Sequence, residues 1–285
     1  MFQGECEGAQ NSKRLKVLIL GSGGRNNHFN QILAANIQQW GYEASILSNS
    51  IVLGKGVQGR VEGDILVYDL DDALRMSTLM AGKATNGASF AAPLLAGSDE
   101  GWPHVRLMIA LSSLSVSRLA LEQMGAVALL HKPFEMGRLQ RYLQAFQKVL
   151  LDESVLESRS NSSARILVVE DHEQMADTIR QCLEFEPGYE VRIANDGLDA
   201  LEQCVAWRPH CIVTDLLLPY MNGYQVMRSL SAASEQQLPA FVVISALTQH
   251  ELPERDVYPR GKEVVFIDKP FHIEHLLDAV ERVLT

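Results

Sequence analysis

The chain passes twice through one series of short apolar runs, each followed by a segment with helical spacing. The clearest run is Cys211-Ile-Val-Thr-Asp215, which ends in a carboxylate and is followed by Pro219 and Gly223. Apolar runs of this length between turn residues are typical of buried strands in a parallel sheet. Regular alternation of strands and helices predicts helices on both faces of such a sheet. We therefore expect an α/β fold with two doubly wound parallel-sheet domains in tandem.

The expected domains are separated by polar segments. Residues 1–14 form a loose N-terminal segment, 15–151 the first domain, 152–164 a linker with the run Glu-Ser-Arg-Ser-Asn-Ser-Ser-Ala, and 165–285 the second domain. The stretch 82–104 is predicted to be a long loop within the first domain. The expected strands are Lys16–Leu20, Glu43–Leu47, Asp64–Asp69, Arg106–Leu111, Ala126–Leu130, Arg165–Val169, Val191–Ala194, Cys211–Asp215, Ala240–Ile244 and Val264–Ile267.

Composition narrows the class of protein. Apolar residues make up 47% of the chain and charged residues 21%, which is ordinary for a globular protein. A net charge of −10 and a pI near 5.3 argue against nucleic-acid binding through general basicity. No apolar run reaches the roughly 18 residues that a membrane span needs, and the first residues lack the apolar core of a signal peptide. We expect a cytoplasmic protein with no membrane insertion.

Reactive side chains follow four of the strands expected in the second domain: Glu170 and Asp171, Asp215, Ser245, and Lys269. The carboxyl ends of parallel strands lie at one edge of a sheet, so these groups should converge. Crowded carboxylates repel one another unless a cation lies between them, and oxygen ligands alone suit Mg²⁺. A carboxylate beside Mg²⁺, a lysine and a hydroxyl predicts a site for phosphoryl transfer.

These residues resemble the receiver domains of two-component response regulators. The resemblance covers residues 165–285 and implies a flavodoxin-like (βα)5 fold, so the chain as a whole resembles a response regulator with tandem receiver domains. The motifs that carry the resemblance, with spacings that fit the family pattern, are Glu170-Asp171, Asp215 with Pro219 and Gly223, Ser245-Ala246 and Lys269-Pro270-Phe271.

The resemblance implies roles for the acidic residues. Asp215 would accept a phosphoryl group from a phosphohistidine on a sensor histidine kinase or phosphotransfer protein. Asp171 and Asp215 would ligate Mg²⁺ directly, Glu170 would assist through water, and the backbone carbonyl of Leu217 would be a further ligand. The chain would be a signalling protein rather than an enzyme, because a receiver catalyses only its own phosphotransfer and dephosphorylation.

The resemblance also implies how the modified state is detected. Ser245 would bind a phosphoryl oxygen and Lys269 would pair with the acyl phosphate. Phe266 matches the aromatic switch residue, although an ordinary core aromatic is the alternative. Leu217 and Leu247 flank the phosphoryl group, and their bulk should hinder an attacking water and make hydrolysis slow, over minutes to hours.

The first domain carries an incomplete copy of this site. Asp69, Ser112 and Lys132 correspond to Asp215, Ser245 and Lys269, but Gly21-Ser22 replaces the acidic pair. We therefore interpret this half as a pseudo-receiver that binds Mg²⁺ weakly and does not accept phosphoryl. Without a metal, Lys132 is expected to pair permanently with Asp69.

Two alternatives remain open. The turn Gly21-Ser22-Gly23-Gly24-Arg25 could cradle a nucleotide or another anion with its backbone N–H groups, and this opening also resembles that of ATP-grasp ligases. A Mg²⁺-dependent phosphohydrolase of the haloacid-dehalogenase type is the second alternative. That family requires D-x-D-x-[TV] after its first strand, which neither Asp69-Leu-Asp71 nor Asp215-Leu-Leu217 supplies.

Output is expected to pass through protein contacts. No helix-turn-helix, cyclase or methylesterase segment lies outside the two expected domains, so a downstream protein partner is predicted. The first domain would dock on the second, form a homodimer or bind that partner. The segment from Pro253 to Pro259 interrupts the face through which receivers commonly pair, so the usual symmetric dimer is not assumed.

Overall fold

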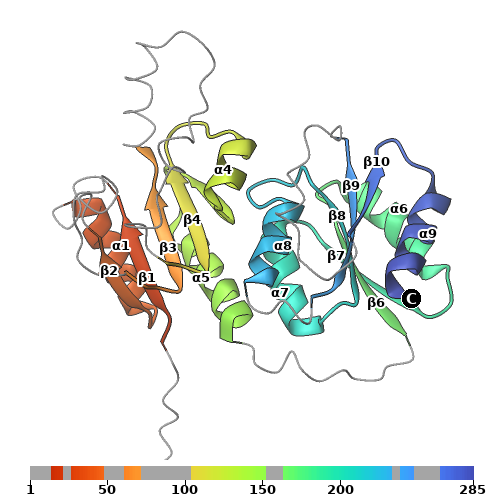
Figure 1. The fold of residues 1–285 in the computed structure, drawn as a ribbon, viewed down its shortest axis with the longest axis horizontal. Helices are drawn as coiled ribbons and strands as arrows, with labels where there is room; N and C mark the ends of the chain where they lie inside the picture. Colours follow the sequence, from red (N-terminus) through yellow and green to blue (C-terminus); the bar gives the residue numbers. More distant parts are fainter. Residues whose placement is uncertain are drawn as a thin grey trace, which may run out of the picture.

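The computed structural model describes residues 14–21, 27–47, 61–71, 104–151, 163–232, 238–246 and 264–285. These residues form two parallel sheets of five strands each, one in each half of the chain (Figure 1). Helices cover both faces of each sheet, as the alternating pattern predicts. None of the helices within the described ranges is both long and apolar enough to cross a bilayer.

The first sheet has the strand order β2-β1-β3-β4-β5, which is the flavodoxin-like order. In this order the chain reverses direction across the sheet between β1 and β3, so the carboxyl ends of these two strands border the usual site of chemistry. Its elements are β1 (Lys16–Leu20), α1 (His28–Gln39), β2 (Glu43–Ile46), β3 (Ile65–Asp69), β4 (Leu107–Ser112), α4 (Arg118–Met124), β5 (Ala128–His131) and α5 (Met136–Leu151).

The second sheet repeats this order as β7-β6-β8-β9-β10. The reversal now falls between β6 and β8, so the end of β8 occupies the position that the end of β3 occupies in the first sheet. Its elements are β6 (Ala164–Val169), α6 (Glu173–Glu184), β7 (Tyr189–Ala194), α7 (Gly197–Trp207), β8 (Cys211–Asp215), α8 (Gly223–Ser231), β9 (Ala240–Ser245), β10 (Val264–Asp268) and α9 (Ile273–Leu284).

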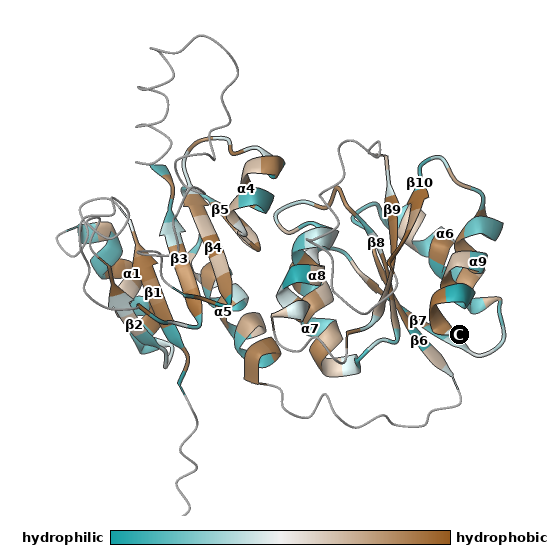
Figure 2. Cartoon of the chain, in the orientation of Figure 1, coloured by the Kyte–Doolittle hydropathy of each residue, from teal (hydrophilic) through white to brown (hydrophobic). Residues whose placement is uncertain are grey.

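Alternation along the strands explains why both faces of each sheet are covered. In β1, Val17 and Ile19 pack in the core beneath α1 and α5, whereas Leu18 and Leu20 pack in the core that includes α4. Successive side chains of a strand point to opposite faces, so a strand that is apolar throughout needs cover on both. Figure 2 shows the strands as largely apolar and the helices as a mixture of apolar and polar residues.

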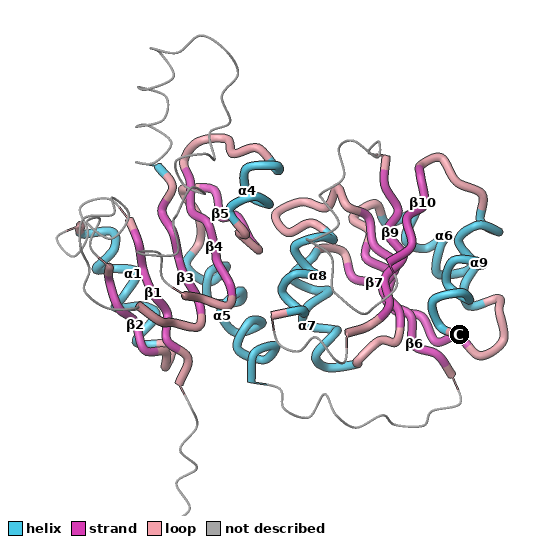
Figure 3. The backbone as a smooth tube through the Cα atoms, in the orientation of Figure 1, coloured by secondary structure: helices cyan, strands magenta, loops and turns pink. Residues whose placement is uncertain are grey.

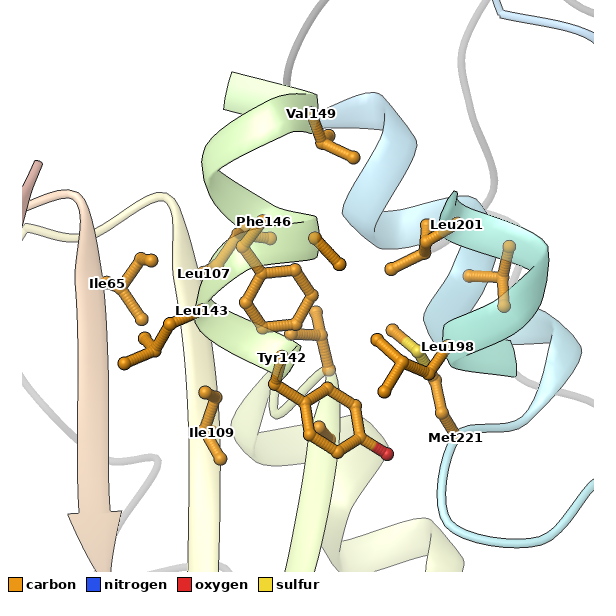
Figure 4. Close-up of a cluster of buried hydrophobic side chains, with 14 of the residues drawn as sticks. Ile65, Leu107, Ile109, Tyr142, Leu143, Phe146, Val149, Leu198, Leu201 and Met221 are labelled. Carbon is orange, nitrogen blue, oxygen red and sulfur yellow. The ribbon is translucent and has the colours of Figure 1, made fainter. Parts of the chain in front are cut away.

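Helix α5 joins the two halves. Its apolar residues recur at helical spacing over a wide stripe, part of which packs on its own sheet. Tyr142 and Phe146, whose ring centroids are 6.0 Å apart, belong to the same buried core as Leu198 and Leu201 of α7 and Met221 before α8 (Figure 4). The core of the first half therefore continues into the second across α5, α7 and α8.

Polar contacts surround this shared core. Glu122 of α4 is buried beside the second half, and burial raises its pKa although the charge of Arg118 and the nearby Asn222 side chain act in the opposite direction. Contacts that join the two halves are Arg106 Nη2 to the Ala232 carbonyl (2.8 Å), Gln225 Nε2 to the Ala126 carbonyl (3.2 Å) and Arg141 Nη2 to Glu202 Oε2 (3.1 Å).

The predicted order of strands and helices is confirmed in both halves, with local corrections at element ends. The fifth strand begins at Ala128 rather than Ala126, because the Ala126 N–H instead bonds to the Leu121 carbonyl and closes α4. The strand β6 begins at Ala164, which the sequence analysis places in the linker, and Ala164 pairs with Tyr189. That pairing also starts β7 two residues before Val191.

Several sequence predictions lie outside the described residues. They concern the N-terminal segment up to residue 13, the turn at 22–26, the loop at 82–103, the linker at 152–162, Leu247 and the stretch from Pro253 to Pro259.

Candidate functional site

Asp215 ends β8, the central strand of the second sheet, and its side chain is held from two sides. Lys269 Nζ, from the connection after β10, lies 2.6 Å from Asp215 Oδ2 and 3.4 Å from Glu170 Oε2. The Leu217 N–H donates to Asp215 Oδ1 at 2.7 Å. The tertiary structure thus brings Glu170, Asp215 and Lys269 together at one edge of the sheet, as their positions after parallel strands predict.

The electrostatics of Lys269 reflect its acidic neighbours. Partial burial acts to lower the pKa of the Lys269 ammonium, but hydrogen bonds and charge interactions with Asp215 and Glu170 outweigh burial and raise it. Lys269 therefore stays charged at neutral pH and provides a fixed positive charge beside Asp215. A group that binds to the Asp215 carboxylate therefore lies next to the Lys269 ammonium.

Ser245 lies on the strand beside Asp215. It ends β9 and is buried, and its carbonyl accepts the Lys269 N–H at 2.7 Å. In the register, Asp215 pairs with Ile244, so Ser245 lies one residue further along the neighbouring strand. Phe266 of β10 is 37% exposed, which rules out the interpretation of this residue as an ordinary core aromatic.

The acidic pair that precedes α6 is divided between interior and surface. Glu170 is buried, whereas Asp171 is exposed. Within the described parts of the chain, no three His, Cys, Asp or Glu side chains are already grouped as a metal site. The donor set nevertheless fits Mg²⁺ in kind, because Glu170, Asp171 and Asp215 offer only oxygen ligands around one sheet edge.

Comparison with known proteins assigns a family to this half. Residues 166–281 match the family described as "Response regulator receiver domain". These residues form a response regulator receiver domain. Glu170, Asp171, Asp215, Ser245 and Lys269 all lie within the matched receiver domain.

Individual proteins are similar to this half of the chain. The response regulator MprA of Mycobacterium ulcerans is 33% identical over 122 residues, which are 43% of this chain and 50% of the relative. MprA of Mycobacterium leprae is 32% identical over 120 residues, or 42% and 50% of the two chains. The chain thus spans about half the length of these curated relatives. A solved signal receiver domain from Bermanella marisrubri is 31% identical and covers 43% of this chain and 99% of its own, with a TM-score of 0.38.

The corresponding edge of the first sheet contains the expected pair of Lys132 and Asp69. Lys132 Nζ lies 2.7 Å from Asp69 Oδ1, and also 2.8 Å from Asp71 Oδ2. Asp71 further accepts the Ser113 N–H at 2.6 Å and the Ser112 hydroxyl at 3.3 Å. Burial acts to raise the pKa of Asp71, but hydrogen bonds from Lys132 and Ser113 and the charge of Lys132 lower it overall.

The first position of the missing acidic pair, residue 21, has close neighbours in the first sheet. Gly21 follows β1 where Glu170 follows β6, and Asn30 of α1 is fully buried beside it. A Cβ atom on Gly21 would lie 2.8 Å from Asn30 Oδ1 and 3.0 Å from Asp69 Cβ. An acidic side chain at residue 21 has no room without movement of its neighbours.

Sequence reasoning missed some of these residues. The contact of Asp71 with Lys132 could have been predicted, because Asp71 lies only two residues after Asp69 and a turn can direct it toward the same lysine. Asn30 carried no signal, since its place beside Gly21 depends on how α1 packs. The burial of Glu122 at the contact between the halves likewise could not be predicted without the tertiary structure.

Proposed function

We propose that this protein is a two-component response regulator in which Asp215 accepts a phosphoryl group from a phosphohistidine. The observation that carries the proposal is the convergence of Asp215 with Lys269 and Glu170 within a receiver domain. The Asp215 carboxylate oxygen forms a bond to phosphorus as the bond from phosphorus to the donor imidazole nitrogen breaks. The donor imidazole leaves with the electron pair of that bond.

The other residues of the edge support this transfer. Lys269 offsets the negative charge that develops on the phosphoryl oxygens, and Ser245 is placed beside Asp215 to receive one of them. Glu170, Asp171, Asp215 and the Leu217 carbonyl would hold Mg²⁺, which supplies further positive charge to the phosphoryl oxygens. Phe266, which is partly exposed, is the proposed switch residue that follows Ser245.

The first domain is, in this proposal, a pseudo-receiver that is not phosphorylated. Lys132 contacts both Asp69 and Asp71, and Asn30 lies against Gly21, where the first acid of the pair would stand. Its role is docking on the receiver, and its contacts with α7 and α8 support that role. Sensor histidine kinase and downstream protein are the proposed partners.

The test uses the full chain with acetyl phosphate and Mg²⁺, followed by intact mass spectrometry. A single phosphoryl adduct is expected in the wild-type protein, with none in Asp215→Asn and none without Mg²⁺. Repeated turnover of diverse phosphate monoesters, without a stable adduct, would instead support the phosphohydrolase alternative. Absence of any adduct in the wild-type protein would refute the proposal.

The lifetime of the adduct is a second measurement. The Leu217 side chain is 48% exposed after Asp215, where it offers an attacking water no hydrogen bond. Loss of the phosphoryl group should therefore take minutes to hours, and Leu217→Asn should shorten the lifetime. Loss within seconds in the wild-type protein would contradict this role of Leu217.

A further inference from the structure

We infer that the first domain detects the phosphorylation state of Asp215 within the same chain, through the connection between β8 and α8. This inference rests on the proposed function, since it requires that Asp215 is modified. The contact that transmits the change is the stacking of Arg138, on α5 of the first domain, over the ring of Tyr220. Phosphorylation then weakens docking of the first domain on α7 and α8.

The connection after β8 is short and fixed at both ends. At one end, the Leu217 N–H binds the Asp215 carboxylate. At the other end, Met221 is fully buried in the core that both halves share, and its N–H donates to the Pro219 carbonyl at 2.7 Å. Gly197 begins α7 directly against Met221, and a Cβ atom at that position would collide with the Met221 carbonyl. Only a few residues separate Leu217 from Met221. A backbone movement at Leu217 therefore reaches the interface between the two domains through a short segment.

Tyr220, between these fixed ends, has a strained backbone. Its φ of 63° lies in the left-handed region, which residues with a Cβ atom rarely adopt. The Arg138 guanidinium carbon lies 4.0 Å from the centroid of the Tyr220 ring, so the first domain contacts the strained residue itself. Loss of this contact removes an interaction that favours the strained conformation.

Further contacts with the first domain lie along α8. Figure 3 shows that α8 lies on the side of the second sheet nearer the first domain. Asn222 caps α8 and forms a capping box with Gln225, whose side-chain Nε2 also donates to the Ala126 carbonyl of the first domain. At the other end of the helix, Arg106 donates to the Ala232 carbonyl. The first domain thus contacts α8 at both ends, and the phosphoacceptor loop leads directly into the first of these contacts.

The direction of the effect follows from which groups bind the Asp215 carboxylate. Lys269 and the Leu217 N–H donate to its two oxygens. A phosphoryl group places new, more negative oxygens beyond the carboxylate, and these donors are drawn toward them. Movement of Leu217 displaces Tyr220 from Arg138, so the interface contacts formed with the unmodified carboxylate weaken. Because coupling is reciprocal, weaker docking must also favour the modified state of Asp215.

Hydrogen exchange of the full chain tests this inference, with beryllium fluoride and Mg²⁺ as the phosphoryl mimic and acetyl phosphate as the donor. The readout is α5, which belongs to the other domain and reports on docking rather than on the modified site. Exchange in α5 should rise by about fivefold or more on modification, the lower range of typical coupling. Intact mass on the same samples establishes whether Asp215 is modified.

Two matched variants separate the contact from a general charge effect. Arg138→Ala removes an exposed side chain, so the protein should remain folded. Hydrogen exchange in α5 should be faster than in the wild type before modification, and it should rise less after modification. It should also bind beryllium fluoride more tightly. Arg180→Ala is the control. Arg180 is a partly exposed arginine on α6, and its ion pairs among the described residues are with Asp177 and Glu184 of the same helix.

Each result is decisive. A rise in α5 exchange that Arg138→Ala diminishes and Arg180→Ala leaves intact supports the inference. A phosphoryl adduct with unchanged α5 exchange overturns the inference and leaves the proposed function standing. An equal rise in wild type and Arg138→Ala excludes the contact with Tyr220 as the transmitter. Absence of an adduct overturns the proposed function and this inference with it.

Discussion

The two sheet edges have the same lysine and aspartate but take their second acid from different places. In the receiver domain, Lys269 pairs with Asp215 and with Glu170, which follows a different strand. In the first domain, Lys132 pairs with Asp69 and with Asp71, two residues further along the same segment. Both lysines precede a cis proline.

The second carboxylate of each edge also differs in its contacts and exposure. Asp71 is bound by Lys132, by the Ser113 N–H and by the Ser112 hydroxyl, and both acids there share one cation. In the receiver, Asp171 directly follows Glu170 in the chain and is exposed. A matching pair of lysine and aspartate therefore occurs at both edges, and the origin of the second carboxylate distinguishes the two.

Removal of the proposed phosphoacceptor should give the largest difference between the edges. Asp215→Asn should abolish the phosphoryl adduct entirely, whereas Asp69→Asn should leave a full adduct on the receiver. The physical reason is that Asp69 lacks the acidic pair beside it. Intact mass after reaction with acetyl phosphate and Mg²⁺ measures both variants. An adduct on Asp69 in the Asp215→Asn protein would break the comparison.

Removal of each lysine tests whether Mg²⁺ can replace it. Lys132→Met leaves Asp69 and Asp71 facing each other without a cation, and should destabilise the first domain by about 2–4 kcal/mol. Mg²⁺ should not recover the stability that Lys132→Met removes, whereas it should partly recover the stability that Lys269→Met removes from the receiver. Hydrogen exchange in increasing urea, followed separately in the strands of each sheet, measures the effect. Equal rescue by Mg²⁺ in both domains would contradict the interpretation of the first as closed.

Gly21→Glu attempts to install an acid where Glu170 lies in the receiver. The new Cβ atom meets Asn30 and Asp69, so we expect a loss of about 1–3 kcal/mol from overpacking and no gain in Mg²⁺ binding. The combined change Gly21→Glu with Asn30→Ala makes room and should recover part of the stability. Urea unfolding with and without Mg²⁺ compares the two variants, and a stable, Mg²⁺-binding single variant would show that the steric reason is wrong.

The smallest expected effect is a dependence of the first domain on acid pH. The pKa of Asp71 is lowered in the folded state, so its contribution is complete above its ordinary value of 3.8 and is lost as pH falls through the folded pKa. Asp71→Asn should remove this dependence and cost about 1 kcal/mol at neutral pH, where the charged hydrogen bonds are lost. Unfolding of both proteins from pH 7 down to pH 3 provides the test. Parallel stability curves would argue against a lowered pKa.

The receiver site was largely predictable because its residues follow strands whose pattern is clear. Apolar runs that end in Glu170, Asp215, Ser245 and Lys269 imply one sheet edge once the strands are parallel. The first edge was predictable only in part. The Lys132 contact with Asp69 follows from the same reasoning, but Asp71 as a second partner depends on the turn after β3.

The sequence by itself determined two parallel sheets, the order of their elements and the convergence of Asp215 with its lysine, because strand periodicity and position after a strand are local properties. Only the tertiary structure decided that α5 packs against α7 and α8, that Asn30 fills the space beside Gly21, and that Arg138 lies over Tyr220. Those contacts depend on the relative placement of surfaces far apart in the chain, which the apolar stripe of α5 permits but does not specify.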